Sequence, residues 1–143
     1  MVEVRVADTE RAREDAFAVR RTVFVEEQGV DEELEYDEHD ATATHFAAYD
    51  GDEPVGAARL RAYEDGVGKV ERVAVLESHR EAGVGRAVMA ALEEQAQREG
   101  LESLKLHAQT RAAGFYRSLG YERYGEEFEE AGIPHVAMRK SLE

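Results

Sequence analysis

The segment Arg80-Glu81-Ala82-Gly83-Val84-Gly85-Arg86 separates two stretches of different periodicity. Before it, residues 70–75 form an apolar run typical of a strand, and after it apolar residues recur at helical spacing. A strand that leads through a glycine-containing loop into a helix gathers unpaired backbone N–H groups at the positive end of the helix dipole. The sequence therefore predicts a strand–loop–helix unit whose loop binds a phosphate group.

The spacing of the glycines narrows the class of phosphate site. A dinucleotide-binding fingerprint needs Gly or Ala at position 88, which is Val88 here, and the sequence has no Gly-Lys-Ser/Thr of a Walker loop. The pattern Arg-x-x-Gly-x-Gly instead resembles the pyrophosphate loop of the GNAT superfamily of acyl-CoA-dependent N-acyltransferases. Many relatives have a basic or small residue where this chain has the acidic Glu81. Because a carboxylate near a pyrophosphate is unfavourable, only the backbone N–H of Glu81 is expected to bind the ligand. The resemblance implies that acetyl-CoA binds to Arg80, Glu81, Ala82, Gly83, Val84, Gly85 and Arg86.

Length and composition restrict the class of protein. At 143 residues, with 43% hydrophobic residues, the chain is expected to form one domain with a substantial core over residues 1–143. No apolar run reaches about 18 residues and no basic-then-apolar segment opens the sequence, so we expect neither a membrane span nor a signal peptide, and a cytoplasmic location. The absence of cysteine excludes disulfides, thiolate metal sites and a cysteine nucleophile.

The charge balance argues against nucleic acid as a partner. The chain has 32 acidic and 18 basic residues, and a net charge of −14 repels DNA and RNA. An acidic composition with few lysines is typical of proteins adapted to high salt, where ions screen self-repulsion, although an ordinary acidic protein is the alternative. An anionic CoA then requires local cations. The arginines in the half of the chain that holds the loop are Arg72, Arg80, Arg86, Arg111 and Arg117.

Periodicity and turn signals predict the order of the elements. The pairs Asp50-Gly51 and Asp65-Gly66 predict hairpins. Strands 69–76 and 104–108 should be parallel neighbours because a helix connects them. The expected elements are a strand over 2–6, a helix from Asp8 or Thr9 to about Glu27, an acidic connection over 31–40 with one helical turn, strands over 45–49, 54–63 and 69–76, a helix over 83–97, a strand over 104–108, a short helix over 110–119, and strands over 121–128 and 135–139.

This order resembles that of the GNAT superfamily over essentially the whole chain. The resemblance implies a mixed α/β (α+β) fold, in which helices flank a central, mostly antiparallel sheet with one parallel strand pair. Three shorter segments resemble the ElaA-like and YjcF-like branch, namely Phe24-Val25-x-Glu27-Gln28, Ala108-Gln109 and Gly132-Ile133-x-His135.

The resemblance also implies roles for individual residues. The backbone of Val73, Ala74 and Val75 would bind the pantetheine arm of acetyl-CoA, although a Val-Ala-Val run is also an ordinary buried strand. Gln109 would bond this arm or cap the helix that follows. The acceptor site would be lined by Glu27, Gln28 and His135. Arg72 would either orient the substrate there or have a structural role.

Tyr116 is the strongest candidate for a catalytic side chain. Phe115-Tyr116-x-x-x-Gly120-Tyr121 resembles a family signature whose tyrosine protonates the departing CoA thiolate. A phenol of pKa about 10 can donate a proton to a thiolate whose conjugate thiol has a pKa of about 8.5. The structural alternative is a core tyrosine with its hydroxyl at the surface.

Glu71 is the candidate base. The attacking amine must lose a proton, and Glu71 lies on the strand before the loop, where strand alternation places it on the same face as Val73. The alternative is an ordinary charged residue on a half-exposed strand. The same alternation places Arg72 on the opposite face.

The five histidines do not predict a metal site. The sequence has no His-Glu-x-x-His motif and no closely spaced histidine pair, so zinc is not expected. His107 alternates with inward leucines and faces either the cleft or solvent. His39 lies beside Asp37 and Asp40 in what we expect to be a solvated run of charges.

These observations together predict a direct acetyl-CoA-dependent N-acetyltransferase that acts on a primary amine. Two alternatives remain open: a noncatalytic acyl-CoA-binding module, and a nucleotide-binding α/β domain. The identity of the amine is unreadable in the sequence, and a homodimer is suggested only by family analogy.

Overall fold

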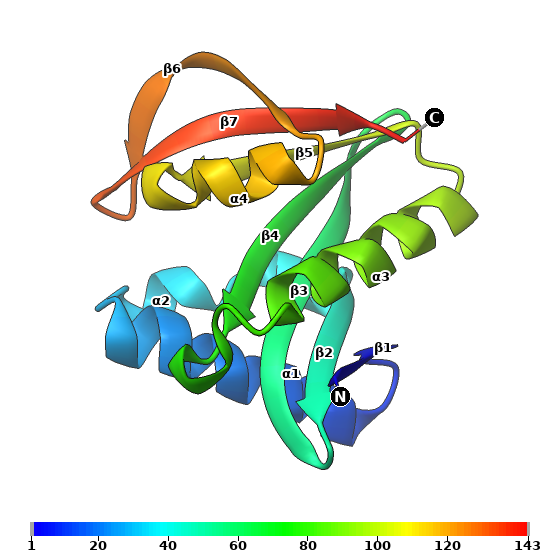
Figure 1. The fold of residues 1–143 in the computed structure, drawn as a ribbon, viewed down its shortest axis with the longest axis vertical. Helices are drawn as coiled ribbons and strands as arrows, with labels where there is room; N and C mark the ends of the chain where they lie inside the picture. The colour runs from blue at the N-terminus through cyan, green and yellow to red at the C-terminus, as the bar shows by residue number, and fades with distance from the viewer. Residues whose placement is uncertain (1, 143) are drawn as a thin grey trace.

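The computed structural model describes residues 2–142, and within them one seven-stranded sheet runs through the molecule (Figure 1). Neighbouring strands follow the order β1-β2-β3-β4-β5-β7-β6, and all pairs are antiparallel except β4 and β5. The predicted, mostly antiparallel sheet with one parallel pair is therefore confirmed. The strands are β1 (Val2–Val6), β2 (Thr44–Asp50), β3 (Glu53–Glu64), β4 (Val67–Val75), β5 (Ser103–Gln109), β6 (Glu122–Glu130) and β7 (Ile133–Ser141).

Helices cover both faces of the sheet. On one face α1 packs on β2, β3 and β4, and on the other α3 packs on β1 to β4. Thr9 caps α1 by accepting a hydrogen bond from the Ala12 N–H at 3.1 Å. In residues 2–142 no helix is both long and apolar enough to cross a membrane. The helices are α1 (Glu10–Arg20), the π-helix η1 (Arg21–Glu27), α2 (Glu32–Glu35), α3 (Val84–Arg98) and α4 (Ala113–Ser118), with 3₁₀ turns η2 (Glu38–Ala41), η3 (Glu77–His79) and η4 (Thr110–Ala112).

The hairpin turns agree with the sequence in two places and differ in a third. Asp50 pairs with Glu53 and Glu64 pairs with Val67, so both Asp-Gly turns are where the sequence places them. The last hairpin is longer than predicted, because β6 and β7 continue until only residues 131 and 132 remain in the turn. Both of these residues have positive φ, of 53° and 76°. Residues 129–130 and 133–134 therefore belong to strands.

The first helix ends at Glu27 as predicted, but its last part is not α-helical. The seven residues of η1 form a π-helix, and the N–H of Gln28 donates to the carbonyl of Val23 at 3.1 Å. A π-helix has a wider turn than an α-helix and is frequent at functional sites. Here it brings the end of the helix to the edge of a cleft.

Candidate active site

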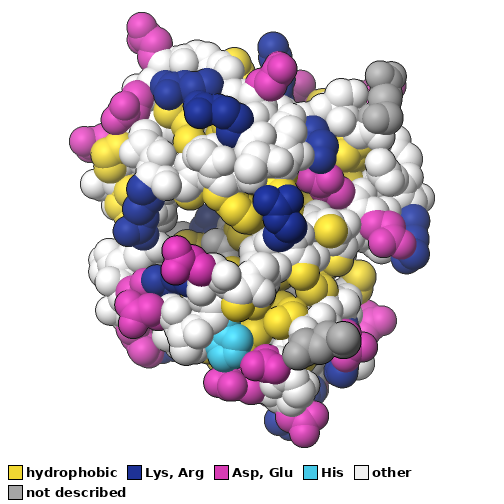
Figure 2. Space-filling view, in the orientation of Figure 1, with side chains coloured by type: hydrophobic (Ala, Val, Ile, Leu, Met, Phe, Trp, Pro, Cys, Tyr) yellow, Lys and Arg dark blue, Asp and Glu magenta, His cyan; other side chains and the backbone are white. Residues whose placement is uncertain are grey.

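β4 and β5 are paired only along their first halves. The parallel register runs from Val67 with Ser103 to Val70 with Leu106 and then stops, because the two strands diverge (Figure 1). A cleft of about 820 Å³ opens at this point, lined by both strands, η1, α2 and the β6–β7 turn. The space-filling view shows the molecule hollowed between the part that carries β6, β7 and α4 and the part that carries α1 and α2 (Figure 2). The divergence leaves the β5 side of β4 without a strand partner along residues 73–75.

The loop after β4 offers unoccupied donors. The backbone N–H groups of residues 83–86 have no acceptor among residues 2–142, at the start of the 15-residue helix α3. Gly83 has φ 82° and Glu81, which is exposed, has φ 68°. A Cβ at Gly85 would lie 3.1 Å from the ring of Phe115, so a larger side chain would crowd the loop. The geometry fits a phosphate-binding helix N-terminus.

Two of the arginines that were expected to supply local positive charge lie near the loop, and they are Arg80 and Arg86. The guanidinium of Arg80 donates to both carboxylate oxygens of Glu27, and also to the carbonyl of Val75 at 3.0 Å. Glu27, which was expected to line the acceptor site, is therefore neutralised by Arg80. Arg86 is exposed, and within residues 2–142 its guanidinium donates only to Ser118 Oγ, at 3.3 Å. The cleft lining still carries more cations than anions: Arg61, Lys69, Arg72, Arg80 and Arg111 against Glu35, Asp37, Glu71 and Glu130.

A β-bulge in β4 overturns the predicted orientation of two side chains. Arg59 pairs with Glu71 and Ala57 pairs with Ala74, so one residue of β3 lies opposite two of β4, and Arg72 has φ 57°. Val73 consequently packs into the core below α3, while Glu71 points the other way. The predictions that Glu71 shares a face with Val73, and that Arg72 lies opposite Glu71, are both wrong.

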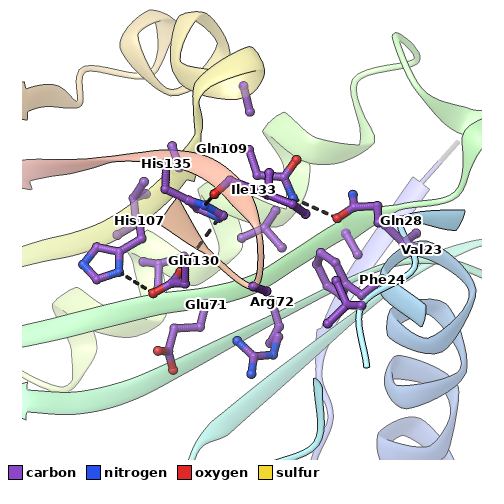
Figure 3. A pocket seen from close by; sticks show the side chains of 18 of the residues that line it. Val23, Phe24, Gln28, Glu71, Arg72, His107, Gln109, Glu130, Ile133 and His135 are labelled. Carbon is purple, nitrogen blue, oxygen red and sulfur yellow. Dashed lines mark hydrogen bonds and ion pairs between the residues drawn. The ribbon is translucent and has the colours of Figure 1, made fainter. Parts of the chain in front are cut away.

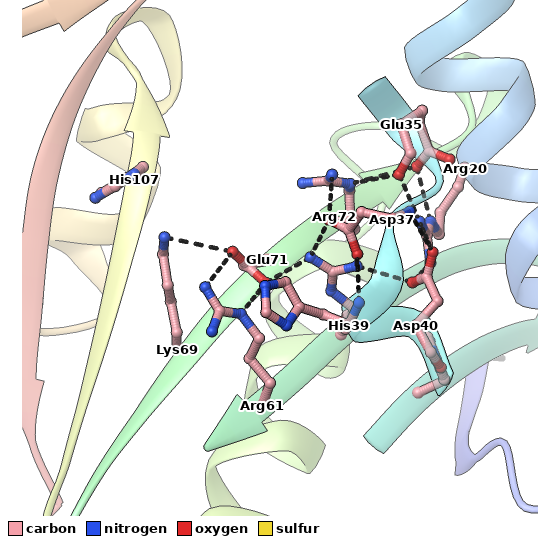
Figure 4. A network of polar contacts seen from close by, with 12 residues as sticks. Arg20, Glu35, Asp37, His39, Asp40, Arg61, Lys69, Glu71, Arg72 and His107 are labelled. Carbon is pink, nitrogen blue, oxygen red and sulfur yellow. Dashed lines mark hydrogen bonds and ion pairs between the residues drawn. The ribbon is translucent and has the colours of Figure 1, made fainter. Parts of the chain in front are cut away.

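Glu71 is held by three cations. Its carboxylate accepts hydrogen bonds from Arg59 at 2.6 Å and Arg61 at 2.8 Å, and Lys69 lies 3.4 Å away (Figure 4). Burial alone would raise the pKa of Glu71, but the hydrogen bond from Arg61 and the charge of Arg59 outweigh it and lower the pKa to about 2. A carboxylate with so low a pKa is a weak proton acceptor near neutral pH.

Asp37 and Asp40 pair with buried arginines and are not part of the solvated run of charges that was expected, whereas Asp31, Glu32, Glu33 and Glu38 of the same connection are exposed. Arg20 and Arg59 are fully buried, and both donate to Asp40 at 2.8 Å. Asp37 accepts from Arg59 at 2.7 Å and from Arg72 at 3.1 Å (Figure 4). Arg72 also donates to the carbonyls of residues 34 and 35, so it fixes α2 against β4.

Tyr116 borders the cleft from α4. Its side chain is 8% exposed, and its hydroxyl has no hydrogen-bond partner among residues 2–142. Burial raises the pKa of this phenol, so it stays protonated in neutral solution. The hydroxyl is therefore able to donate a proton or a hydrogen bond to a ligand.

A hydrogen bond between two glutamines joins two of the elements that line the cleft. Gln109 Nε2 donates to Gln28 Oε1 at 2.8 Å, which joins the end of β5 to the residue after η1 (Figure 3). Arg111 donates in turn to Gln109 Oε1 at 3.0 Å. His107 and His135 both line the cleft, so of the two faces left open for His107 the structure places it toward the cleft. Within the described part of the chain no group of His, Asp and Glu side chains is arranged to hold a metal ion.

A family model described as the acetyltransferase (GNAT) domain matches residues 7–142. The chain belongs to the GNAT acetyltransferase family. It is 49% identical over 136 residues to the uncharacterized N-acetyltransferase YjcF of Bacillus subtilis (strain 168), covering 94% of this chain and 96% of YjcF. A crystal structure assigned as an N-acetyltransferase from Lactobacillus plantarum superimposes with a TM-score of 0.92 at 31% identity, covering 99% and 98% of the two chains. ElaA of Escherichia coli superimposes with a TM-score of 0.86 at 28% identity, covering 98% and 99%.

Within this GNAT N-acetyltransferase, sequence reasoning missed Glu130. The carboxylate lies in the cleft between His107 and His135 (Figure 3). It was overlooked because residues 129–134 were expected to form a loop. Gly132 was the residue that could have predicted the turn. A two-residue turn in which both residues have positive φ would have extended both strands to the cleft.

Backbone strain gathers around the same region. Three non-glycine residues in 2–142 have positive φ, namely Arg72, Glu81 and Ala131. Arg72 and Ala131 line the cleft, and Glu81 lies in the loop before α3. Such conformations are costly and cluster at functional sites.

Proposed function

We propose that this GNAT enzyme transfers an acetyl group from acetyl-CoA directly to a primary amine. One observation carries the proposal: the free edge of β4 leads straight into a loop whose amides, at residues 83–86, have no acceptor in the described chain. Acyl-CoA is the cosubstrate of the family, and bound acetyl-CoA would supply an activated thioester. The amides of residues 83–86 would hold its diphosphate, with Arg80 and Arg86 beside them, and the backbone of residues 73–75 and Gln109 would hold the pantetheine arm.

The residues around the cleft can perform the remaining steps. Tyr116 keeps its proton because burial raises its pKa, and it would give that proton to the departing thiolate. Backbone N–H groups near Val75 would stabilise the tetrahedral oxyanion. Glu71 is not proposed as the base, because its pKa of about 2 leaves it ionised and ion-paired. The absence of cysteine agrees with direct attack by the amine.

Calorimetric titration and a thiol-release assay test this function. We expect the protein to bind CoA and to release CoA thiol from acetyl-CoA when primary amines are added. Gly85→Val should weaken CoA binding at least about tenfold, because its side chain meets Phe115. Gly114→Ala is the matched control, since a Cβ there meets nothing within 4 Å. Affinity for ATP or NAD without affinity for CoA would contradict the proposal, and CoA binding without amine-dependent thiol release would favour a noncatalytic acyl-CoA-binding module.

A further inference from the structure

Glu130 differs from the other carboxylates of the cleft. The other three are paired with arginine nitrogens at 2.6–2.8 Å, and they are Glu35, Asp37 and Glu71. No arginine or lysine in residues 2–142 forms an ion pair with Glu130, whose two carboxylate oxygens instead face His107 and His135. The carboxylate is 49% exposed and lines the cleft, so an incoming cation can reach it.

The hydrogen bonds of the two histidines fix which nitrogen carries the proton in the neutral rings. His135 Nδ1 lies 2.7 Å from the carbonyl oxygen of Ile133, which can only accept, so Nδ1 is the protonated nitrogen. His107 Nδ1 lies 3.1 Å from Glu130 Oε1 and is protonated for the same reason. In neutral His135 the lone pair is therefore on Nε2.

Two acceptors then face each other across a gap. His135 Nε2 and Glu130 Oε2 are 3.8 Å apart, which is too long for a direct hydrogen bond (Figure 3). A donor with at least two hydrogens can satisfy both, with its nitrogen or oxygen about 2.9 Å from each. Water meets this requirement, and so does a primary ammonium group, which the negative charge of Glu130 favours over water.

Packing holds this group in place. The ring of Phe128 stacks on His135 with centroids 6.1 Å apart and contacts His107 edge-on at 4.9 Å. His135 itself is 8% exposed. Glu130 lines the cleft, and Phe128, two residues earlier in β6, packs its ring against both histidines, so the hairpin holds carboxylate and imidazole together.

Building on the acetyl transfer proposed above, we infer that the acceptor is a cationic primary amine whose ammonium binds between Glu130 and His135, and that His135 Nε2 takes its proton. The ammonium gives one proton to Nε2, and the neutral nitrogen forms a C–N bond to the acetyl carbon as the C–S bond breaks. The thiolate leaves with the electron pair and is protonated by Tyr116, which regains a proton from the amide nitrogen. His135 then releases one proton to solvent.

Glu130 serves as the counterion in this step. The hydrogen bond from His107 lowers the pKa of the Glu130 carboxyl against the opposing effect of burial, so Glu130 stays ionised. The charged and titratable groups that act on it are Lys69 from β4, His107 from β5 and His135 from β7. The imidazole is therefore the proton acceptor, and the carboxylate stabilises the imidazolium that forms.

Steady-state kinetics with ethylamine, spermidine and glycinamide test the two roles. Glu130→Gln should raise KM for the cationic amines about tenfold or more, with KM for acetyl-CoA unchanged. His135→Asn keeps a donor toward Ile133 but lacks the basic nitrogen, so kcat/KM should fall about 10²–10⁴-fold. Glu129→Gln, an exposed neighbour on the other face of β6, is the matched control and should match the wild type.

Histidine ¹⁵N spectra of the full chain test the amine site without turnover. Methylammonium chloride should shift the His135 Nε2 resonance in the wild type and not in Glu130→Gln. A proton on Nε2 of neutral His135, or Glu130→Gln and His135→Asn variants that keep wild-type kinetics, would overturn this inference while leaving acetyl transfer intact. CoA binding with no thiol release for any amine would instead count against the proposed function, and the spectra would still decide whether the amine site exists.

Discussion

The hydroxyl groups of the neighbouring residues Tyr116 and Tyr121 have different surroundings. The rings of Tyr116 and Tyr121 lie 5.9 Å apart in one aromatic cluster, and both are buried. The hydroxyl of Tyr121 donates to Glu93 at 2.9 Å, whereas that of Tyr116 has no partner in residues 2–142 and borders the cleft. The Tyr116 hydroxyl therefore contributes nothing to folding through a hydrogen bond within the described chain, and it is available to a ligand in the cleft.

Tyr116→Phe should lower kcat about 10²-fold, since the variant keeps the ring but loses the proton that the thiolate needs. The affinity for CoA and the free energy of unfolding should change little, the latter by less than about 0.5 kcal/mol. Thiol-release kinetics, CoA titration and urea unfolding measure the three quantities.

Tyr121→Phe is the matched control with the opposite pattern. It removes the hydrogen bond from Tyr121 to Glu93 Oε2 and leaves the one from Lys140 to Glu93 Oε1, so it should cost about 1 kcal/mol of stability while kcat stays at the wild-type value. Equal kcat in Tyr116→Phe and Tyr121→Phe would remove Tyr116 from the mechanism.

Arg80, in the loop before α3, forms an ion pair with Glu27 at the end of η1. Its ion pair with Glu27 is about one-third exposed on both sides, and such pairs contribute about 0.2–1 kcal/mol. Glu27→Gln removes the competing charge, so the guanidinium becomes free for the CoA diphosphate and the Kd for CoA should fall up to about fivefold. Glu26→Gln, an exposed change one residue away, should leave the Kd unchanged. Weaker CoA binding in Glu27→Gln would show that Glu27 positions Arg80 for the ligand.

At the scale of the elements, local patterns predicted more of the fold than of the site. The order of strands and helices follows from periodicity, Asp-Gly turns and Gly100, which has φ 79° after α3. The bulge at Arg72 was not predicted from the sequence, because strict alternation assumes one residue of β4 for each residue of β3. The π-helix η1 has no sequence signature, and in the structure it packs against α1, α2 and β4. Glu130 was missed for a similar reason, since Ala131-Gly132 is not a typical hairpin pair.

The segment from α2 to η2 depends on ionised carboxylates. Burial opposes ionisation of Asp40, but the hydrogen bonds from Arg20 and Arg59 lower its pKa to about 2, against about 3.9 in an unfolded chain. Because the folded value is the lower one, the unfolded state binds more protons as the pH falls. The stabilisation is therefore complete above about pH 4, is lost between about pH 4 and pH 2, and amounts to about 2 kcal/mol.

Asp40→Asn should cost about 3 kcal/mol near neutral pH, because Arg20 and Arg59 lose a charged partner inside the protein. The gap in unfolding free energy between this variant and the wild type should narrow as the pH falls below about 4. Urea unfolding measures the gap, down to the lowest pH at which the wild type unfolds cooperatively. Glu33→Gln, an exposed change in α2, should follow the wild type at every pH. A gap that stays constant with pH would mean that Asp40 contributes by packing alone.

At the scale of the whole molecule, charge is distributed unevenly. The chain carries a net −14, yet the cleft lining has five cations and four carboxylates. The acidic excess therefore lies outside the cleft, and an anionic CoA bound as proposed would meet a neutral to positive site in an otherwise repulsive field. Salt should affect the two regions differently, because exposed charges are screened over about 10 Å at 0.1 M and about 3 Å at 1 M, whereas buried pairs are screened much less.

Potassium chloride should therefore stabilise the protein by screening its surface repulsion. Between about 0.1 M and 1 M salt we expect Tm to rise by several degrees, where about 3–5 °C corresponds to 1 kcal/mol in a chain of this size. A variant with Glu14, Glu33 and Glu126 changed to Gln removes three exposed charges, so it should melt higher than the wild type at low salt and respond less to added salt. Calorimetry in matched buffers measures both effects. If the variant and the wild type gain equally from salt, the stabilisation comes from a general effect of salt on hydration, and the acidic surface does not limit stability.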